Sequence, residues 1–393
     1  MSLDKLKKFV RGHIGLSGKI KAACQGLDNS IWVHSASFGE FEEVRPIIRI
    51  IRDRHPEVHI IVTFFSPSGY EYLKDDKIAD RVFYLPLNTR RNARKFLDYV
   101  RPVKVIISIS DYWPAYLREL RKRGIDTYLT SARFEASMFY FKPLGFVYRN
   151  LFRSCFKTFF VRDLISLELL RKIVPEEKLV LAGDPRMDAV INTAESVWKD
   201  DLIEKWLVGN KAFVAGSILE GVDYAITSDL ASSHPDSKFL LVPHEVDAGS
   251  VNSLCNLLHC KYVLYSQSSG VDTEDIPVMI VDTVGMLAKL YRYGFAAYVG
   301  GGFDDTSPHS VVEPAVYGIP VSYGPVIGSH YHCNFLVDCG GGQIIRDGSG
   351  FCEWYDRLVS DSEYRTHSGN AARNYCMQGK GVAASIASRI MED

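Results

Sequence analysis

The chain has 393 residues, which is too long for one ordinary core and suits two domains of about 150–200 residues each. Hydrophobic residues make up 47% of it and charged residues 24%, a composition that excludes a disordered chain. Its eight cysteines form no Cys-x-x-Cys pair and no Cys/His zinc spacing, so we expect inert thiols in a reducing cytoplasm. No run approaches the roughly 20 apolar residues that are needed to span a bilayer.

The formal net charge of −1 hides an asymmetry between the two halves of the chain. Residues 1–200 carry 34 Lys+Arg against 24 Asp+Glu, whereas residues 201–393 carry 12 against 23. The basic excess lies within residues 1–150. A basic half suits an anionic partner surface, and a solvated basic face without a partner fits the counts equally well.

The N-terminus predicts a short basic amphipathic segment. Its apolar and basic residues are Leu3, Leu6, Phe9, Val10 and Ile14 among Lys5, Lys7, Lys8, Arg11, Lys19 and Lys21. Such a segment can lie on anionic lipid, and packing against its own domain is equally compatible with the pattern.

Short apolar, β-branched runs recur along the rest of the chain with helical patterns between them, which indicates parallel strands buried on both faces. The strands predicted in the first half are Ile31–Ala36, His59–Phe64, Val105–Ser110, Thr127–Ser131, Thr158–Val161 and Leu179–Ala182. Those in the second half are Ala212–Gly216, Lys238–Pro243, Val278–Asp282, Ala296–Gly300, Pro320–Tyr323 and Gln343–Arg346. Two series of about six strands predict an α/β protein of two doubly wound, Rossmann-like domains.

Residues 190–210 fall between the two series and form the predicted linker. We therefore expect an N-terminal domain at residues 1–195 and a C-terminal domain at residues 205–393, which includes a terminal helical stretch from residue 362. Open α/β sheets bind ligands at the carboxyl ends of their strands. If the two domains face each other, the loops at both sets of strand ends border one cleft.

The first such loop, residues 34–40, is made of small residues and ends in Gly39 and Glu40. A carboxylate at the rim of the cleft can act as general base toward an acceptor hydroxyl. Equally, Glu40 can simply complement the dipole of a helix N-terminus. Pro46 predicts that this helix begins near it or bends there.

The longest candidate loop combines three glycines at residues 300–302 with the later Glu-Pro-Ala of residues 313–315. Glycines let a ligand approach the backbone, and Ser307 or Ser310 can cap a following helix whose N-terminus would bind an anion. Glu313, one turn into that helix, is placed to hold a ribose hydroxyl pair. The pattern is neither a dinucleotide fingerprint nor a P-loop.

Asp304 and Asp305 suggest a metal site, but no third ligand is evident, so solvated carboxylates are the preferred interpretation. Two further loops follow the first and second strands of the second series. Gly216 and Ser217 offer donors to a phosphate, and His244, after Pro243, can approach a base or phosphate.

Taken in order, these loops resemble the bacterial 3-deoxy-D-manno-octulosonic acid (Kdo) transferases that glycosylate lipid A. The family's small-residue–Gly–Glu, Thr-Pro-Thr-Gly, Leu-Pro-Leu-Asp, Asn-Ala-Arg and Gly-Asn-x-Lys-x-Asp motifs are matched by residues 35–40, 66–69, 85–88, 131–133 and 183–188. Its Ala-Gly-Ser, Val-Pro-x-His and Gly-Gly-x-(x)-His-Asn-x-x-Glu-Pro-Ala motifs are matched by residues 215–217, 242–245 and 301–315. The resemblance runs from about residue 30 to residue 345.

The resemblance implies a GT-B fold and makes Glu40 the general base that deprotonates the acceptor hydroxyl, which then attacks CMP-Kdo with inversion. It implies that the C-terminal domain holds CMP without a metal or other cofactor. The donor-binding residues would be Gly216, Ser217, Pro243, His244, Gly301, Gly302, Ser310 and Glu313. The acceptor-binding residues would be Ser37, Gly39, Asp111, Arg133 and Lys142.

The sequence also departs from the family. Its Glu-Thr-Glu-Leu-Trp-Pro-Asn appears as residues 109–115, with Ile109 replacing the first Glu and Asp111 the second. His244 stands where many members have Arg. Members commonly have an apolar N-terminal anchor, and the start Met1-Ser2-Leu3 fits the removal of one.

The expected partners are CMP-Kdo, a lipid A precursor and an anionic membrane surface, with no nucleic acid. We expect the protein at the cytoplasmic face of the bacterial inner membrane, held peripherally or by an N-terminal anchor missing from this chain. Residues 138–142, aromatic and basic, add to the membrane prediction, as do Arg149 and Arg153, unless the aromatics are core. The alternatives are another GT-B enzyme that uses a UDP-sugar, including a UDP-GlcNAc 2-epimerase, and a catalytically degenerate nucleotide-binding protein at the membrane.

Overall fold

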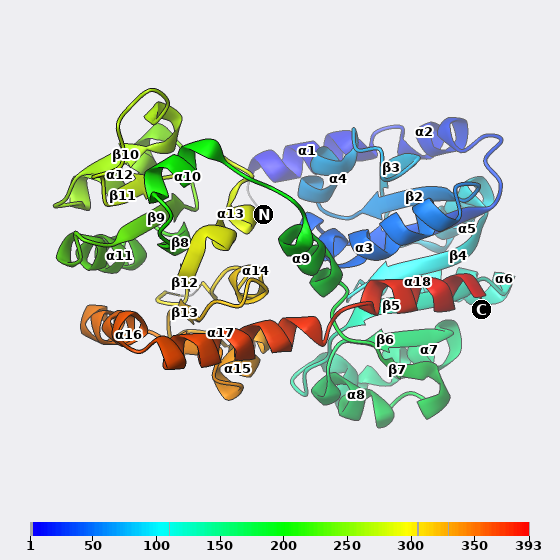
Figure 1. The fold of residues 1–393 in the computed structure, drawn as a ribbon. Helices are drawn as coiled ribbons and strands as arrows, with labels where there is room; N and C mark the ends of the chain where they lie inside the picture. Colours follow the sequence, from blue (N-terminus) through cyan, green and yellow to red (C-terminus); the bar gives the residue numbers. More distant parts are fainter. Residues whose placement is uncertain (1–2, 110, 305, 329, 393) are drawn as a thin grey trace. The chain divides into compact units, whose positions relative to one another are not determined.

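The computed structural model describes residues 3–109, 111–304, 306–328 and 330–392, with the side chains of residues 3–6 outside the described part. The chain forms two compact units (Figure 1), residues 1–188 with 381–393 and residues 189–380. Each unit contains a parallel sheet of seven strands. The predicted fold class, two Rossmann-like α/β domains, is therefore confirmed.

The sheet of the first unit has the strand order β3-β2-β1-β4-β5-β6-β7. Its strands are β1 (Ser30–Ser35), β2 (His59–Phe64), β3 (Arg81–Tyr84), β4 (Pro102–Ser108), β5 (Asp126–Ala132), β6 (Thr158–Val161) and β7 (Leu179–Leu181). Its helices are α1 (Leu3–His13), α2 (Leu16–Ala23), α3 (Phe38–Arg54), α4 (Pro67–Leu73), α5 (Arg90–Val100), α6 (Pro114–Arg123), η1 (Phe139–Phe141), η2 (Pro143–Gly145), α7 (Phe146–Cys155), α8 (Leu164–Arg171), η3 (Glu176–Lys178) and α18 (Val382–Glu392).

The sheet of the second unit has the order β10-β11-β9-β8-β12-β13-β14. Its strands are β8 (Ala212–Ile218), β9 (Lys238–Pro243), β10 (Tyr262–Leu264), β11 (Val278–Ile280), β12 (Gly294–Val299), β13 (Val321–Tyr323) and β14 (Gly342–Ile344). Its helices are α10 (Asp201–Leu207), α11 (Val222–Ser233), α12 (Ala248–Leu257), η4 (Tyr265–Gln267), α13 (Leu287–Leu290), η5 (Tyr291–Tyr293), α14 (Val312–Ala315), α15 (Tyr331–Asp338), α16 (Gly348–Ser360) and α17 (Ser362–Met377). Helix α9 (Arg186–Glu195) runs across the boundary between the units.

Strand β1 shows why the predicted strands lack polar alternation. All six of its residues are buried, because helices pack on both faces of the sheet. Trp32 joins the hydrophobic cluster on one face, whereas Ile31 and Val33 join the cluster on the other. Burial on both faces requires an apolar side chain at successive positions, and this pattern made the strand recognisable in the sequence.

Two strands were missed in the sequence, β3 and β10, and each lies at an edge of its sheet. Edge strands contact the core less, and both begin with an exposed residue, Arg81 and Tyr262. Both contain a short apolar run, residues 82–85 and 262–265, which the prediction passed over.

The predicted linker is wrong. Residues 186–195 and 201–207 form helices α9 and α10, and the first of the two segments that make up the first unit ends at Asp188. Helix α10 belongs to the second unit, since Ile203, Trp206 and Leu207 are buried in one of its hydrophobic clusters. The aromatic and aliphatic spacing of this helix was the signal that the chain had already entered a folded unit.

The assignment of the terminal helix to the C-terminal domain is also wrong. Helix α18 packs on α3 of the first unit, where Ile386 and Ile390 share a hydrophobic cluster with Ile47. Asp188 accepts hydrogen bonds from the backbone N–H groups of Gly381 and Ala383, both at 2.6 Å, and so caps the start of α18. Helix α3 continues through Pro46, so the alternative that it begins near this proline is wrong as well.

Across the described parts of the chain, we find no helix with the length and apolar character that crossing a membrane requires.

Candidate active site

Glu40 lies in the first turn of α3, directly after the carboxyl end of β1. Ser37 caps this helix, because its hydroxyl accepts the Glu40 N–H at 3.4 Å. The Glu40 carboxylate turns back and accepts the N–H of Ala36 at 2.6 Å, an arrangement similar to a capping box. The interpretation of Glu40 as part of the helix cap is therefore confirmed, and the general-base interpretation stays a prediction for a half-buried carboxylate at the strand ends.

The environment of Glu40 raises its pKa above the ordinary value for glutamate. Burial is the main cause, and it outweighs the hydrogen bond from Ala36, which lowers the pKa. The nearby Asp111 charge raises the pKa further. A raised pKa makes the ionised carboxylate a stronger base, as general-base catalysis requires.

Asp111, predicted to contact the acceptor, follows strand β4 and reaches the same place. Its Oδ2 lies 2.8 Å from Nε2 of His34, a β1 residue that is 1% exposed. Ser108, at the end of β4, donates its hydroxyl to the backbone carbonyl of Glu40 at 2.8 Å. Strands β1 and β4 are neighbours in the sheet, and this pairing brings Glu40 and Asp111 together.

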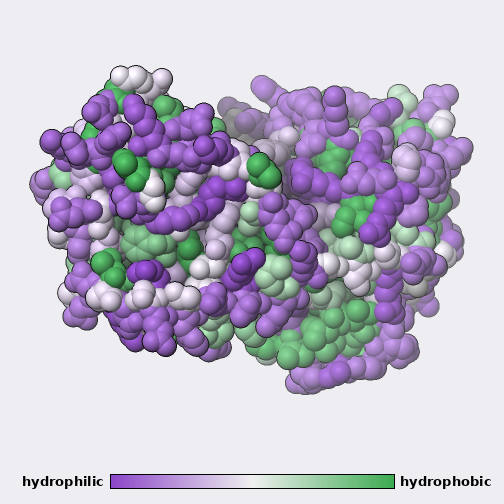
Figure 2. All heavy atoms as spheres, in the orientation of Figure 1, coloured by the Kyte–Doolittle hydropathy of each residue, from purple (hydrophilic) through white to green (hydrophobic). Residues whose placement is uncertain are grey.

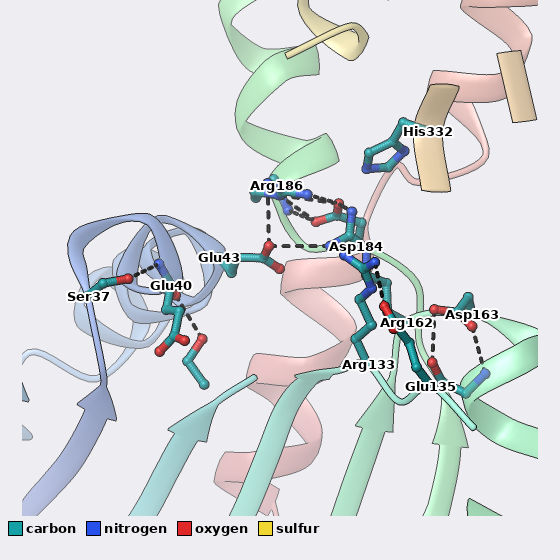
Figure 3. Close-up of polar contacts among 12 residues, drawn as sticks. Ser37, Glu40, Glu43, Arg133, Glu135, Arg162, Asp163, Asp184, Arg186 and His332 are labelled. Carbon is teal, nitrogen blue, oxygen red and sulfur yellow. Dashed lines mark hydrogen bonds and ion pairs between the residues drawn. The ribbon is translucent and has the colours of Figure 1, made fainter. Parts of the chain in front are cut away.

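Figure 3 shows a buried ionic cluster beside Glu40. Arg162 contacts Glu43 at 3.3 Å and Asp184 at 2.8 Å, and all three side chains are less than 10% exposed. Arg186 contacts the same two carboxylates, at 3.3 and 2.8 Å. Sequence reasoning missed Glu43 and Arg162, because an isolated charged residue gives no sign of burial.

The remaining candidates of the first unit lie apart from this cluster or at its edge. Arg133, which follows β5, is about one-third exposed and pairs with Glu135 at 3.1 Å (Figure 3). Lys142 lies exposed between η1 and η2. Gly39 is exposed in the first turn of α3, with no atom within 4 Å of the position where a Cβ would be.

In the second unit, the predicted donor residues lie at or after the carboxyl ends of three adjacent strands, β9, β8 and β12: Gly216 and Ser217 are still within β8, and Pro243 is the last residue of β9. The N–H of Gly300 donates to the carbonyl of Gly216 at 2.9 Å, and the N–H of His244 donates to Ile218 at 2.9 Å. Gly301 has a φ of 94°, and a Cβ there would lie 2.8 Å from the carbonyl oxygen of Ser307. The backbone can adopt this loop only with glycine at that position.

Asp223 holds these loops together, and sequence reasoning missed it. Its carboxylate, 3% exposed, accepts the N–H of Leu219 at 2.9 Å, the N–H of Gly301 at 2.8 Å and the hydroxyl of Tyr298 at 2.6 Å. Three donors satisfy one buried charge. The feature of the sequence that could have revealed Asp223 is its place in the first turn of the helix after Gly216 and Ser217.

His244 stacks on His309, with ring centroids 4.3 Å apart and an interplanar angle of 14°. Burial lowers the pKa of His309, and the neighbouring His244 lowers it further. Two imidazoles therefore stand beside the glycine loop, where an anionic ligand could be bound by N–H donors.

The predicted helix cap after the glycine loop is wrong. Helix α14 is a single turn, begins at Val312 and has no side-chain cap, so neither Ser307 nor Ser310 caps it. Such a short helix provides little dipole for an anion. Glu313 nevertheless lies near the site, because its charge acts on Tyr291, whose hydroxyl would lie 2.2 Å from a Cβ on Gly216. Asp305 lies outside the described residues.

Comparison with known proteins finds 3-deoxy-D-manno-octulosonic acid transferases among the proteins that are similar to this chain. A family model described as "3-Deoxy-D-manno-octulosonic-acid transferase (kdotransferase)" matches residues 10–189. The 3-deoxy-D-manno-octulosonic acid transferase of Haemophilus influenzae is 26% identical over 369 residues, which cover 90% of this chain and 84% of the relative. That of Aquifex aeolicus is 26% identical over 330 residues, covering 83% and 82%.

Solved structures show the same fold at low sequence identity. UDP-GlcNAc 2-epimerase from Neisseria meningitidis, bound to UDP-GlcNAc, superposes with a TM-score of 0.63 at 15% identity, covering 92% of this chain and 99% of that one. MurG from Acinetobacter baumannii gives a TM-score of 0.59 at 11% identity, covering 93% and 100%. At such identities the likeness concerns the fold alone.

Proposed function

We propose that the chain is a Kdo transferase and that it carries Kdo from CMP-Kdo to a lipid A precursor, with inversion, in lipopolysaccharide biosynthesis. The observation that supports the proposal most is the Glu40 carboxylate at the carboxyl end of β1, with its pKa raised by burial. An ionised Glu40 would take the proton of the acceptor's primary hydroxyl as the oxygen attacks the anomeric carbon and CMP leaves.

The loops of the second unit would hold the CMP part of the donor. The glycine loop at residues 300–302 is buried, and Gly216, Ser217 and the stacked imidazoles of His244 and His309 lie beside it. CMP carries one phosphate, whose charge N–H and hydroxyl donors can compensate. We therefore propose donor binding without a metal ion, and we expect EDTA to leave the rate unchanged. Activity abolished by EDTA and restored by Mg²⁺ would contradict this and direct attention to Asp304.

The acceptor would bind to the first unit, which carries the basic excess of the sequence. Exposed apolar residues flank Lys142 in the sequence: Phe139 is 46% exposed, Leu144 72% and Phe146 56%. Met138, Tyr140 and Phe141 instead pack against the core, so the aromatic stretch is only partly available to lipid. Hydrophobic side chains also gather on the lower part of this unit in Figure 2, where Figure 1 places α8 and where Leu164 and Ile165 are exposed.

These features support the proposal that the first unit binds the membrane surface peripherally. The geometry of the loop around Lys142 is fixed by Arg149, which donates to the carbonyls of Tyr140 at 2.9 Å and Lys142 at 2.8 Å. A fixed loop presents its apolar residues beside a cation, as an acylated and phosphorylated acceptor requires. We propose a position at the cytoplasmic face of the inner membrane.

A transfer assay tests the function directly. The protein is incubated with CMP-Kdo and a lipid A precursor, and the mass of the product is measured by mass spectrometry. We expect the acceptor to gain one or more Kdo units, and release of CMP to accompany each gain. CMP should also raise the melting temperature more than UDP does. No gain in mass, together with stabilisation by UDP alone, would favour a UDP-sugar enzyme instead.

A further inference from the structure

We infer that Ile109 is a specificity-determining residue of the acceptor site: its strained backbone, directly after β4, presents an aliphatic side chain to an apolar group of the acceptor. This role rests on the proposed Kdo transfer, and it assigns Ile109 to acceptor binding rather than to the proton transfer at Glu40. The apolar group is an acyl chain or the C–H face of a sugar ring.

The backbone of Ile109 has a left-handed conformation, with a φ of 62°. A β-branched side chain crowds its own backbone there, so the conformation costs free energy and is rare for isoleucine. Arg101 and Val208 have similar φ values, 46° and 50°, but each is the C-cap of a helix, where this conformation is common. Ile109 instead follows the carboxyl end of strand β4. A helix end therefore does not account for the strain at Ile109.

Two hydrogen bonds hold Ile109 in this conformation. Its N–H donates to the carbonyl of Thr130 on the neighbouring strand β5 at 3.0 Å. Its carbonyl accepts the hydroxyl of Tyr112 at 2.9 Å. Tyr112 is 6% exposed and belongs to a hydrophobic cluster of the first unit, so its hydroxyl has a fixed position. The surrounding structure thus enforces the strain, as it does for strained residues at binding sites.

Packing in the core does not compensate for the strain. The side chain of Ile109 is half-buried, and none of the hydrophobic clusters that the described residues form includes it. Its neighbours in the sequence belong to the candidate site. Ser108 donates to the carbonyl of Glu40, and Asp111 contacts His34. An aliphatic side chain that is held at the strand ends, outside the core, is suited to contacting a ligand.

The chemistry of this side chain limits what can lie against it. Isoleucine neither donates nor accepts a hydrogen bond, so a phosphate or hydroxyl placed there would lose water without gaining a partner. An apolar group gains free energy from the same burial. The motif that residues 109–115 resemble has Glu at this position, so a charged surface is replaced here by an apolar one. The acceptor therefore presents an apolar group to Ile109.

Transfer kinetics of three variants test this role. Ile109→Gly can adopt the same φ without strain and removes the side chain. We expect it to raise the acceptor KM about five- to twentyfold and to leave kcat and the KM for CMP-Kdo within about twofold, because the lost contact is made before and during the reaction alike. Ile109→Val keeps an apolar surface and should stay within about threefold of the wild type. Ile109→Glu should raise the acceptor KM at least as far as Ile109→Gly, since a charge would then meet the apolar group.

Val208→Gly is the matched control, because it relieves a β-branched residue of the same conformation in the second unit. It should leave both KM values unchanged. Thermal unfolding is the second measurement. Glycine removes the strain at either position, so both variants should melt no more than about 2 °C below the wild type. A large fall in the melting temperature of Ile109→Gly alone would show that the side chain supports the fold, and would overturn its role in specificity.

Two acceptors identify the apolar group: an acylated lipid A precursor and the deacylated, phosphorylated disaccharide. Where an acceptor is not turned over, calorimetric titration gives its Kd in place of the KM. A contact with an acyl chain makes Ile109→Gly weaken only the acylated acceptor, whereas a contact with the sugar weakens both. A wild type that transfers Kdo, with unchanged acceptor KM in Ile109→Gly and Ile109→Glu, would overturn the role of Ile109 alone. A wild type that transfers no Kdo would overturn the proposed function, and the role of Ile109 with it.

Discussion

The two units have the same fold, but different kinds of residue lie at the ends of their strands. In the first unit, the strand ends carry charged side chains that are held from behind by buried partners, such as His34 behind Asp111 and Arg162 behind Glu43. In the second, the strand ends carry buried glycines that let the backbone segments pack closely, and one buried carboxylate, Asp223, joins the loops by hydrogen bonds. The first site is suited to moving a proton, and the second to enclosing a ligand. Substitutions at the first site should therefore mainly lower turnover, whereas substitutions at the second should mainly weaken ligand binding.

Glu40→Ala tests the first half of this comparison and should have the largest effect. We expect turnover to fall by about 10²–10⁴-fold, the range for a lost general base, while CMP still stabilises the protein. Glu40→Gln keeps an acceptor for the Ala36 N–H. Its turnover should nevertheless fall as far as that of Glu40→Ala, because an amide cannot take up the proton of the acceptor hydroxyl. Steady-state transfer assays and thermal shifts with CMP measure both quantities.

Glu42→Gln, on the same helix, is the matched control and should keep full turnover. Near-wild-type turnover in Glu40→Gln would show that the carboxylate serves only to cap α3, and the assignment of the general base would be lost.

Gly216→Ala tests the second half. A Cβ at this position would lie 2.2 Å from the hydroxyl oxygen of Tyr291 and 2.7 Å from a Leu287 methyl, so the loop must shift. Such overpacking costs about 1–3 kcal/mol, and we expect affinity for CMP to fall about 10–100-fold with kcat less affected. Gly348→Ala, whose new methyl would meet its nearest atom at 3.9 Å, is the control. Calorimetric titration with CMP measures the loss, and equal affinities in both variants would contradict the prediction.

Asp223→Asn should loosen the same loops by a smaller amount. The amide can accept two of the three hydrogen bonds at most, and its NH₂ group would face a donor, at a cost of about 1–3 kcal/mol. We expect a lower melting temperature and CMP affinity reduced about tenfold. The control is Asp229→Asn, an exposed change on the same helix. Unchanged affinity in Asp223→Asn would mean that the loops keep their shape without this tie.

The sequence allowed the fold and the loops to be predicted because both leave local marks. Buried strands such as His59–Phe64 and Thr158–Val161 are continuous apolar runs, and they occupy the predicted bounds. Glycine-rich loops are visible because only glycine tolerates their geometry. The resemblance in motifs then added what spacing alone left open, the choice of Glu40 over an ordinary helix cap.

Features that depend on contacts between distant segments of the chain could not be predicted from the sequence. Asp188 and α18 are about 190 residues apart, and no local pattern assigns the terminal helix to the first unit. The pairing of His34 with Asp111 spans 77 residues and exists only because β1 and β4 are neighbours. The supposed cap at Ser307 or Ser310 failed for the opposite reason, since a good local capping residue preceded a helix of one turn.

The two units also differ in charge, and the first unit carries exposed basic residues on helix α1. Helix α1 packs on its own unit, because Phe9 contacts Phe65 at 5.3 Å between ring centroids, and yet Val10 and Ile14 stay more than half exposed. Its basic residues Lys7, Lys8 and Arg11 are exposed beside them. Each cation near an anionic leaflet contributes about 1 kcal/mol, and only within a Debye length of about 8–10 Å.

We therefore expect the protein to co-sediment with anionic vesicles, to dissociate as salt is raised and to bind neutral vesicles weakly. Reversing the charges of Lys7, Lys8 and Arg11 to Glu should reduce binding about three- to tenfold, because the apolar side chains around Lys142 still contribute. The matched control reverses three exposed cations of the acidic second unit, Lys205, Lys261 and Arg373, and should change binding little, since that unit carries no basic excess toward the surface. Equal losses in the two triple variants would show that net charge alone matters. Binding that is indifferent to salt and to lipid charge would show that the basic residues of the first unit are simply solvated.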